Sequence, residues 1–250
     1  RVRSILVTSG TLSPLPSYSM EMGLHFPHTL ENPHIINDRQ IHVRVIGKGV
    51  SGKLLTSSYE RRKDKDYYVE LGNTLVALAK VTPAGMLIFF PSYSVMETCL
   101  EEWGGPASAS KKNDKKNNFF ASRSRNQAGK FSFPHIPNHF ASNPASHTTP
   151  WKRLLSIKSV VVEPKSSSDL HDALADFTKF LGQQNSHGCV LMGVCRGKIS
   201  EGIDFANEQS RAVVITGLPF PPSFDPKVKM KREFLDNAKA IGNAQPSTVG

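Results

Sequence analysis

A polar loop rich in glycine and carboxylates follows one of the most apolar runs of this chain. Residues Gly197–Phe205 follow Cys189–Cys195 after the single residue Arg196, and Cys189–Cys195 has the character of a buried strand. Glycines such as Gly202 let backbone amides approach a phosphate or a ribose closely, and Glu201 and Asp204 can accept hydrogen bonds from hydroxyl groups or a basic partner. The loop is therefore a candidate ligand-binding element. The alternative is a tight strand-to-helix turn with a solvated carboxylate.

Two further apolar runs lead into loops of small residues with hydroxyl groups. Ile5–Val7 runs into Thr8–Pro14, and Met86–Phe90 runs into Pro91–Ser94, which a helix-like stretch at Val95–Trp103 follows. Ligands of parallel α/β sheets collect beyond the carboxyl ends of the strands. We therefore expect the polar residues that follow such strands to lie at one edge of a sheet.

In this order the three loops resemble motifs III, IV and V of the superfamily 2 DNA helicases of the iron–sulfur, xeroderma pigmentosum D-like family. Two more segments, Leu30–Ile36 and Thr216–Pro222, also look like this family. Matching segments cover most of the chain except about 104–150, so their combination is far more specific than any one motif. The resemblance implies the second of the two RecA-like domains with which these helicases use ATP, move along single-stranded DNA and unwind duplexes.

The resemblance gives roles to residues of the last of these loops. Gly202 and Asp204 would lie near the nucleotide, and Glu201 would help to fix the loop. Lys198 and Ser200 would lie nearer the path of the DNA. For Asp204, the alternative role is to cap a short helix.

The loop after Met86–Phe90 is expected to face DNA. Ser92 and Tyr93 would donate to a DNA phosphate, and the Tyr93 ring offers a stacking face as well. The alternative is a buried tyrosine whose hydroxyl is already satisfied. Thr216 follows the last predicted strand and is similarly placed for a contact with the DNA backbone.

The resemblance links Thr8, Ser9 and Thr11 to the coupling between ATP hydrolysis and strand movement, although these hydroxyls would also suffice for a local turn. Phosphoryl transfer itself needs a phosphate cradle, a magnesium ligand and a cation on the developing charge. The chain contains no GxxxxGK[ST] loop, no Asp-Glu-x-His box and no Gln-x-x-Gly-Arg motif. We therefore expect no complete catalytic set and no activity from this chain alone. ATP and magnesium would bind together with the missing first domain.

The expected partners are single-stranded or forked DNA and the first RecA-like domain of the same parent chain, with no membrane. The resemblance also implies a nuclear protein of DNA repair, and an iron–sulfur cluster only in the missing N-terminal part. The chain begins at Arg1, within a motif, which is typical of a fragment. The alternative function is a non-catalytic module that binds nucleic acid or a partner protein, left by truncation of a helicase gene.

Composition narrows the class of protein only modestly. The 250 residues carry a net charge of +10 and have a pI of about 9.6, which favours a polyanionic partner. Much of that charge lies in one central stretch, at Lys111, Lys112, Lys115, Lys116, Arg123, Arg125 and Lys130. Three cysteines without CxxC spacing argue against a disulfide framework and against a self-contained metal or iron–sulfur site. No apolar run approaches the length of a membrane span.

Alternating apolar runs and helical periods predict an α/β fold, a parallel sheet flanked by helices, and the resemblance implies the RecA-like helicase type. The predicted strands are Ser4–Thr8, Ile41–Ile46, Met86–Phe90, Ser159–Glu163, Val190–Cys195 and Ala212–Thr216. The predicted helices are Leu15–Gly23, Asp66–Val81, Val95–Trp103, Ser168–Leu181 and Lys227–Ala240. Ser17 and Ser168 are possible helix caps.

Residues 104–150 break this rhythm. The stretch is rich in Ser, Asn, Lys and Pro, has no period, and predicts a disordered, low-complexity insertion. It would divide the second RecA-like domain into 1–103 and 151–250, with that domain incomplete at its C-terminus. Phe119 and Phe120 lie near basic residues, which leaves open a stacking surface for nucleic acid. A retained intron or a gene-model error is also open.

Overall fold

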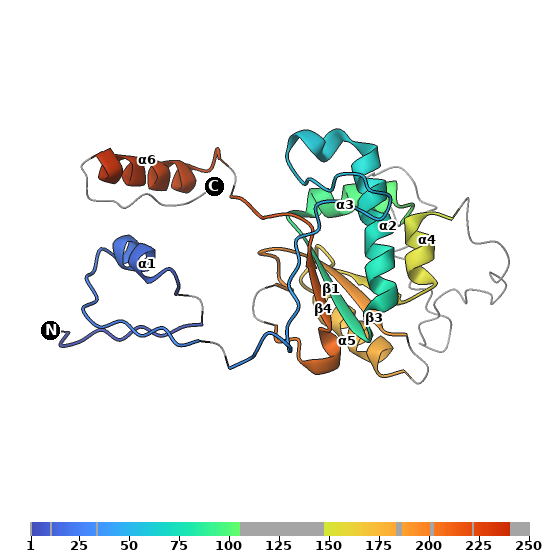
Figure 1. Cartoon of the computed structure of the whole chain (residues 1–250), viewed down its shortest axis with the longest axis horizontal. Coiled ribbons are helices and arrows are strands. Elements are labelled where there is room, and N and C mark those ends of the chain that lie inside the picture. The colour runs from blue at the N-terminus through green and yellow to red at the C-terminus, as the bar shows by residue number, and fades with distance from the viewer. Residues whose placement is uncertain are drawn as a thin grey trace. The chain divides into compact units, whose positions relative to one another are not determined.

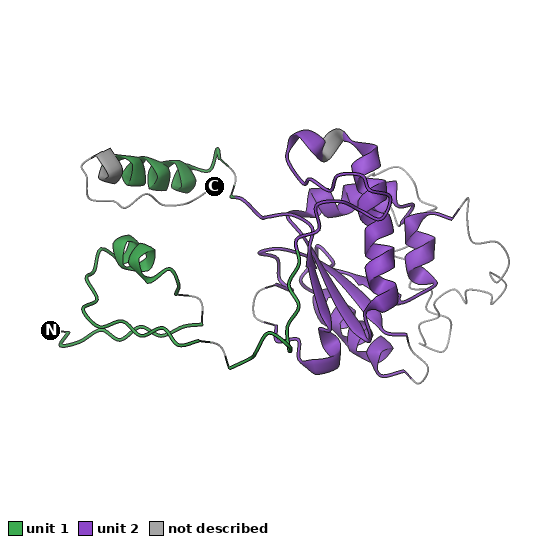
Figure 2. Cartoon of the chain, viewed as in Figure 1, with its two compact units in different colours: residues 1–44, 221–250 green, residues 45–220 purple. Residues whose placement is uncertain are grey.

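The computed structural model describes residues 2–10, 12–33, 35–105, 148–183, 187–200, 203–221 and 223–240. The chain divides into two compact units (Figure 2). Unit 1 contains residues 1–44 and 221–250, and unit 2 contains residues 45–220. Most of the predicted insertion at 104–150 lies outside the described residues, so its disorder and the domain limits drawn around it stay predictions.

Unit 2 is built on a four-stranded parallel sheet with the strand order β2-β3-β1-β4 (Figure 1). The strands are β1 (Gly85–Phe90), β2 (Ser159–Val162), β3 (Cys189–Val194) and β4 (Ala212–Ile215). Gly85 of β1 and Ser159 of β2 both pair with Cys189 of β3, so these three strands run in step. The predicted α/β fold with a parallel sheet is confirmed.

Helices cover both faces of this sheet. They are α2 (Lys65–Val81), α3 (Tyr93–Glu102), α4 (Pro150–Leu155) and α5 (Leu170–Leu181), with short 3-10 turns at Glu60–Lys63 and Asn207–Gln209. Met86 and Ile88 of β1 pack in one buried cluster with side chains of α2, α3 and α4. Leu87 packs in a second cluster with Phe177 of α5. Alternate residues of β1 thus face opposite layers, as the two-residue period of a strand requires.

The first residues of two helices show how local hydrogen bonds set element boundaries. Ser92 caps α3, because its hydroxyl oxygen accepts from the Val95 amide at 3.3 Å. The predicted cap Ser168 is wrong, since α5 begins after Asp169. The Ser168 hydroxyl donates to the Asp169 carboxylate at 3.0 Å, and Asp169 occupies the cap position without a side-chain hydrogen bond to the helix.

Unit 1 contains two helices among its described residues, α1 (Leu15–Met22) and α6 (Pro226–Ala240), close to the predicted bounds. Within this unit Lys231 of α6 forms an exposed ion pair with Glu21 of α1. The predicted cap Ser17 is wrong, because it lies inside α1 rather than ahead of it.

Two predicted strands are also wrong. Ser4–Thr8 and Ile41–Ile46 have no strand conformation. A strand persists only where a neighbour pairs with its backbone, and neither segment pairs with a strand in the described part of the chain. Leu6 is 93% exposed and Val45 is 98% exposed. The apolar pattern therefore predicted strands without the partner that would stabilise them.

Candidate functional site

The carboxyl ends of the four parallel strands of unit 2 meet at one edge of the sheet. There β1 leads into Ser92 and Tyr93, β2 into Glu163, β3 into the loop with Lys198, and β4 into Thr216. We call this the carboxyl edge. It is the edge at which open α/β sheets bind their ligands. The structure therefore brings these four predicted residues to one edge, together with Glu163, which the sequence did not single out.

A buried carboxylate, Glu163, holds three of these strand ends together. Only 2% of its surface is exposed. Its Oε1 accepts from the Tyr93 hydroxyl at 2.8 Å and from the Lys198 amide at 3.0 Å. Its Oε2 accepts from the Val194 amide at 2.7 Å. A buried carboxylate is tolerated only with such donors, so the three hydrogen bonds are a condition of the fold at this edge.

The same contact defines the state of Tyr93. Burial, and then the hydrogen bond and charge of Glu163, raise the pKa of the Tyr93 phenol from 10.0 to about 12. The residue is half-buried, and its proton is committed to the carboxylate. This geometry favours the alternative of a satisfied hydroxyl over one that donates to a DNA phosphate. A stacking role for the ring stays a prediction.

The loop after β3 approaches Glu163 so closely that position 197 requires glycine. A Cβ on Gly197 would lie 2.7 Å from the Val194 carbonyl oxygen and 2.9 Å from Glu163 Oε1. The neighbouring Arg196 is exposed and has a φ of 60°, a left-handed conformation that costs a non-glycine residue about 1 kcal/mol. Backbone contacts with the buried carboxylate therefore fix this loop from below.

The polar ends of the same loop lie at the surface. Lys198 Nζ donates to the Lys165 carbonyl oxygen at 2.8 Å, and the Lys165 ammonium pairs with Glu97. Ser200 is exposed, and its hydroxyl donates to the Gly197 carbonyl oxygen at 3.0 Å. The loop thus places the charge of Lys198 and the hydroxyl of Ser200 at the surface, while the buried Glu163 holds its backbone.

Ser92 and Thr216 differ in what they can still offer a ligand. The Ser92 oxygen accepts from a backbone amide, which leaves its own proton available to a phosphate. The Thr216 hydroxyl donates to the Phe89 carbonyl oxygen at 3.2 Å, and the Thr216 amide donates to the same oxygen at 2.9 Å. Thr216 can therefore accept a hydrogen bond, but its proton is already used.

The remaining predicted residues fall into two groups. Asp204 is exposed at the end of the β3 loop, and its alternative role as a helix cap is wrong, because the next 3-10 turn begins after Ala206. Its companions Glu201 and Gly202 lie outside the described residues.

The coupling residues predicted near the start of the chain belong to unit 1, whereas the carboxyl edge belongs to unit 2. Thr8 and Ser9 are exposed, and Thr11 lies outside the described residues. Their role in coupling therefore stays a prediction.

One glycine-rich segment was not recognised in the sequence. Gly47–Leu54 reads GxxxxGK with leucine in place of the Ser or Thr of a phosphate loop. Its Ser51 donates an amide and a hydroxyl to the Glu70 carboxylate, at 2.6 and 2.7 Å. Glu70 lies on α2 and is 3% exposed. A carboxylate of the chain itself thus takes these donors, which argues against a phosphate site in this segment.

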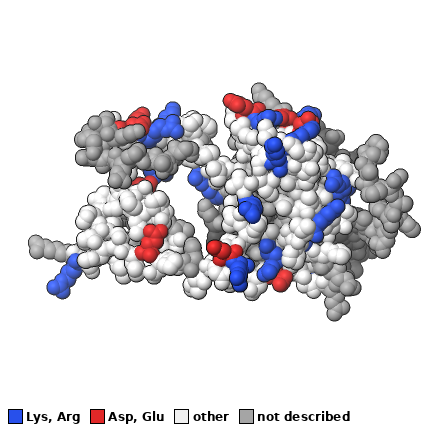
Figure 3. Space-filling model, in the orientation of Figure 1, with Lys and Arg blue, Asp and Glu red and all other residues white. Residues whose placement is uncertain are grey.

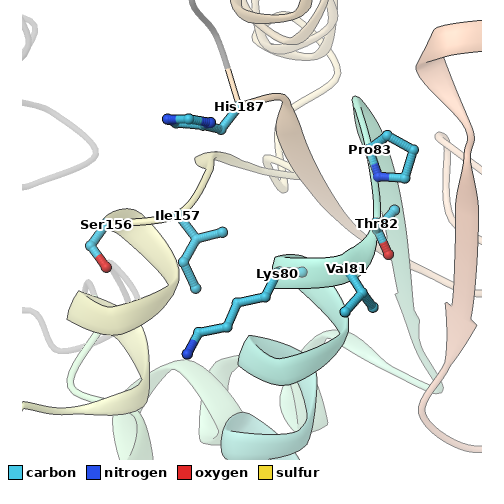
Figure 4. A pocket seen from close by; sticks show the side chains of 8 residues that line it. Lys80, Val81, Thr82, Pro83, Ser156, Ile157 and His187 are labelled. Atoms are coloured by element: carbon cyan, nitrogen blue, oxygen red, sulfur yellow. The ribbon is translucent and has the colours of Figure 1, made fainter. Parts of the chain in front are cut away.

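A hollow of about 440 Å³ lies at the opposite edge of the sheet, where the strands begin (Figure 4). Pro83, Ile157 and His187 line it, each just before a strand, and no predicted site residue does. The adjoining Lys158 is 2% exposed. Its Nζ donates to the carbonyl oxygens of Ala84 and His187, at 2.8 and 2.6 Å, and burial lowers its pKa. We call this the amino edge.

Lysine and arginine side chains are spread over the visible face of unit 2 rather than gathered into one patch (Figure 3). Among the residues that the structure describes, no group of three or more His, Cys, Asp or Glu side chains is placed to hold a metal ion. No helix in the described ranges has the length and apolar character needed to cross a bilayer. At the carboxyl edge the Glu163 oxygens accept three hydrogen bonds, and among the described residues of the β3 loop Asp204 is an exposed carboxylate that a ligand can reach.

A family model described as the helicase C-terminal domain matches residues 75–247. The match includes all four strands and the loops of the carboxyl edge. The chain belongs to the helicase C-terminal domain family.

Curated relatives agree with this family assignment. The chain is 40% identical over 242 residues to the regulator of telomere elongation helicase 1 homolog of Oryza sativa subsp. japonica, and 41% identical over 244 residues to that of Arabidopsis thaliana. It is 37% identical over 243 residues to the regulator of telomere elongation helicase 1 of Homo sapiens. These matches cover 97%, 98% and 97% of this chain, but only 21%, 20% and 16% of the relatives.

Two segments distinguish members within the iron–sulfur family. Leu30–Ile36 and Thr216–Pro222 predict a likeness first to the regulator of telomere elongation helicase and second to the Fanconi anaemia group J helicase. The relatives confirm the resemblance to the iron–sulfur superfamily 2 helicases and to the first of these two proteins.

Proposed function

We propose that this chain is the second RecA-like motor domain of a longer ATP-dependent DNA helicase that moves along single-stranded DNA and unwinds duplexes. The carboxyl edge carries the proposal, because Glu163 ties together the loops after β1 and β3 where a parallel α/β domain binds ligands. Family membership supplies the class of reaction. The chain spans about a fifth of the length of its plant relatives, so the activity is proposed for the parent protein.

ATP, bound with magnesium between this domain and a first RecA-like domain of the parent chain, would supply the free energy for translocation. On this side, exposed Asp204 would accept a hydrogen bond from a nucleotide hydroxyl, with Glu201 and Gly202 shaping the loop. The described residues would therefore contact the nucleotide from one side, and they supply no cradle for its phosphates. Glu163 is saturated by donors, and Glu70 takes donors of the glycine-rich segment.

DNA would lie along the loops of the carboxyl edge. Lys198 and Ser200 would contact backbone phosphates, and Ser92 has a proton to donate to one. Such contacts position a strand without reading its sequence. Tyr93 would contribute a ring face for base stacking, and Thr216 would accept a hydrogen bond from the strand or from ordered water.

Several further features of the parent protein belong to this proposal. Thr8, Ser9 and Thr11 would couple hydrolysis to strand movement. The second RecA-like domain would comprise 1–103 and 151–250, with 104–150 as an insertion. Because the relatives are named for telomere elongation, we extend to the parent protein a nuclear role in telomere maintenance and DNA repair. Any iron–sulfur cluster would be held by residues outside this chain.

A second candidate is a module that binds nucleic acid or a partner protein without turning over ATP. Such a module needs no phosphate cradle, and the glycine-rich segment supplies none, because its Ser51 donates to Glu70. The first candidate predicts that the parent protein hydrolyses ATP, and the second predicts that it does not. Both predict binding at the carboxyl edge.

Binding of a fluorescent single-stranded oligonucleotide, followed over a range of salt concentrations, tests the proposal. We expect weak binding that falls steeply with salt, and a slope that Lys198→Ala makes shallower by about 0.7. Tyr93→Ala should cost about 1 kcal/mol if a base stacks on the ring. Deleting residues 106–147 should lower the affinity equally for all sequences. If the deletion abolishes binding while both point variants change nothing, the carboxyl edge is not the DNA site.

ATP hydrolysis by the isolated chain gives a separate test. Because the described residues complete neither a phosphate cradle nor a magnesium site, we expect no turnover above background, with or without DNA. DNA-stimulated turnover that Asp204→Ala abolishes would contradict the view that a first domain is required.

A further inference from the structure

Glu163 lies between two loops to which the proposed function gives different tasks. The loop after β1 carries Ser92 and Tyr93 for DNA, and the loop after β3 carries Lys198 and Asp204 for DNA and nucleotide. We propose that Glu163 is the positioning residue that fixes these two loops relative to each other. The inference rests on the proposed function for the tasks of the loops, and on observed hydrogen bonds for the connection between them.

On the β3 side, the carboxylate holds both ends of one turn. The Val194 amide donates to Oε2 and the Lys198 amide donates to Oε1. The turn between them is closed by the Gly197 amide, which donates to the Val194 carbonyl oxygen at 2.8 Å. Two converging amides around one anion form the same arrangement that binds phosphates in other loops. Here Glu163 fills it, so the path of the loop depends on this carboxylate.

On the β1 side, the Tyr93 hydroxyl is the link. Tyr93 is the first residue of α3, directly after the cap Ser92, so any displacement of its ring is transmitted to the start of the helix. Glu163 therefore joins the base of the nucleotide-facing loop to the base of the DNA-facing one through a single side chain. Because it is 2% exposed, solvent cannot readily replace its partners.

A general loss of stability is the competing explanation for any Glu163 variant, and the chain contains a matched control. Glu70 is equally buried, at 3% exposure, and its carboxylate also accepts a backbone amide and a hydroxyl, both from Ser51. It lies on α2, and its printed hydrogen bonds go to Ser51 and not to the loops after β1 and β3. Glu70→Gln therefore perturbs a similar network without touching the proposed site.

The experiment compares Glu163→Gln, Glu70→Gln and Tyr93→Phe in the whole chain. A glutamine at 163 has one acceptor oxygen in place of two. Its side-chain NH2 must therefore face the backbone N–H of either Val194 or Lys198, and two donors then oppose each other. We expect amide exchange at Lys198 or Val194 to rise about tenfold and oligonucleotide affinity to fall about fivefold. The Tyr93 pKa should fall below about 12, because the negative charge of Glu163 is lost while the burial of Tyr93 remains. Glu70→Gln should lower thermal stability but leave all three readouts unchanged.

Equal losses of DNA affinity in Glu163→Gln and Glu70→Gln at matched stability would overturn the inference. Unchanged exchange at both Val194 and Lys198 in Glu163→Gln would also overturn it. If the wild-type chain binds no DNA, the proposed function fails, and amide exchange and the Tyr93 pKa still decide the role of Glu163. If Glu163→Gln does not fold, Tyr93→Phe decides: an affinity about threefold lower supports the link, and an unchanged affinity refutes it.

Discussion

Each of the two edges of the sheet contains a buried charged side chain that bonds to neighbouring strand ends, and the two charges are opposite. Strand β2 is preceded by Lys158 and followed by Glu163, and each is 2% exposed. The Lys158 ammonium donates to two carbonyl oxygens, just before β1 and β3, whereas the Glu163 carboxylate accepts from two amides and a hydroxyl at or just after the ends of these strands. Both residues thus tie neighbouring strand ends to the edge of β2.

The two edges differ in the hydrogen-bond partners of these buried charges. Among the described residues, the Lys158 ammonium donates to the main-chain oxygens of Ala84 and His187, so these hydrogen bonds fix strand ends and involve none of the predicted site residues. Glu163 contacts Tyr93 and the loop that bears Lys198. The hollow of about 440 Å³ lies at the amino edge, yet the polar residues predicted from sequence, such as Tyr93 and Lys198, lie at the carboxyl edge. The carboxyl edge is therefore the candidate site because polar side chains converge there, although the hollow lies at the other edge.

Glu163→Leu should break the carboxyl edge with the largest effect. It leaves the Val194 amide, the Lys198 amide and the Tyr93 hydroxyl without their acceptor. We expect the free energy of unfolding to fall by about 3 kcal/mol, together with oligonucleotide affinity. Urea denaturation followed by circular dichroism measures the first quantity. A loss below roughly 0.5 kcal/mol would mean that water replaces the carboxylate without cost, against the burial observed.

Lys158→Met should break the amino edge with a smaller effect. The substitution keeps the length of the side chain but removes the donor to the Ala84 and His187 carbonyl oxygens. We expect about 2 kcal/mol lower stability and, at temperatures where the variant is folded, unchanged oligonucleotide affinity. Denaturation and anisotropy titrations on one preparation give both values. Loss of DNA binding in the folded variant would remove the contrast between the edges.

The smallest effect, at Tyr93, sharpens the comparison through its pH dependence. The Tyr93 pKa is about 12 in the folded chain and 10.0 for the free side chain, so folding favours the protonated phenol. Its contribution to stability is therefore complete below about pH 10 and is lost as the pH rises through about 12. The stability difference between wild type and Tyr93→Phe, about 1 kcal/mol at neutral pH, should shrink over this window. A difference that grows with pH would contradict the assigned hydrogen bond.

Elements with continuous apolar runs or a clear helical period were predictable from sequence. Strand β3 and helices α2 and α5 lie within two residues of their predicted bounds. Helix α4 was missed because six residues carry too little periodicity, and it is stabilised by burial of Trp151 and Leu154. Ser4–Thr8 was predicted as a strand from local pattern, although strand formation depends on a partner that the pattern cannot identify.

The candidate site was predictable in part, because local sequence shows where a strand ends but not which strands lie beside it. Residues that directly follow strands, such as Tyr93 and Lys198, could be assigned to one edge because parallel strands end together. Glu163 and Lys158 were not recognised, since a charged residue beside a short apolar run usually marks where the run reaches solvent. Their burial depends on the order β2-β3-β1-β4, which places β2 beside β3, and that order is not local in the sequence.

Hydrogen exchange of the whole chain, with and without a single-stranded oligonucleotide at low salt, tests most directly whether the carboxyl edge is the binding face. We predict that DNA slows exchange at residues 91–95 and 194–200, which hold the loops after β1 and β3. Exchange at 80–84 and 156–158, beside the hollow of the amino edge, should not change. Slower exchange at the amino edge, or only within 106–147, would contradict the account.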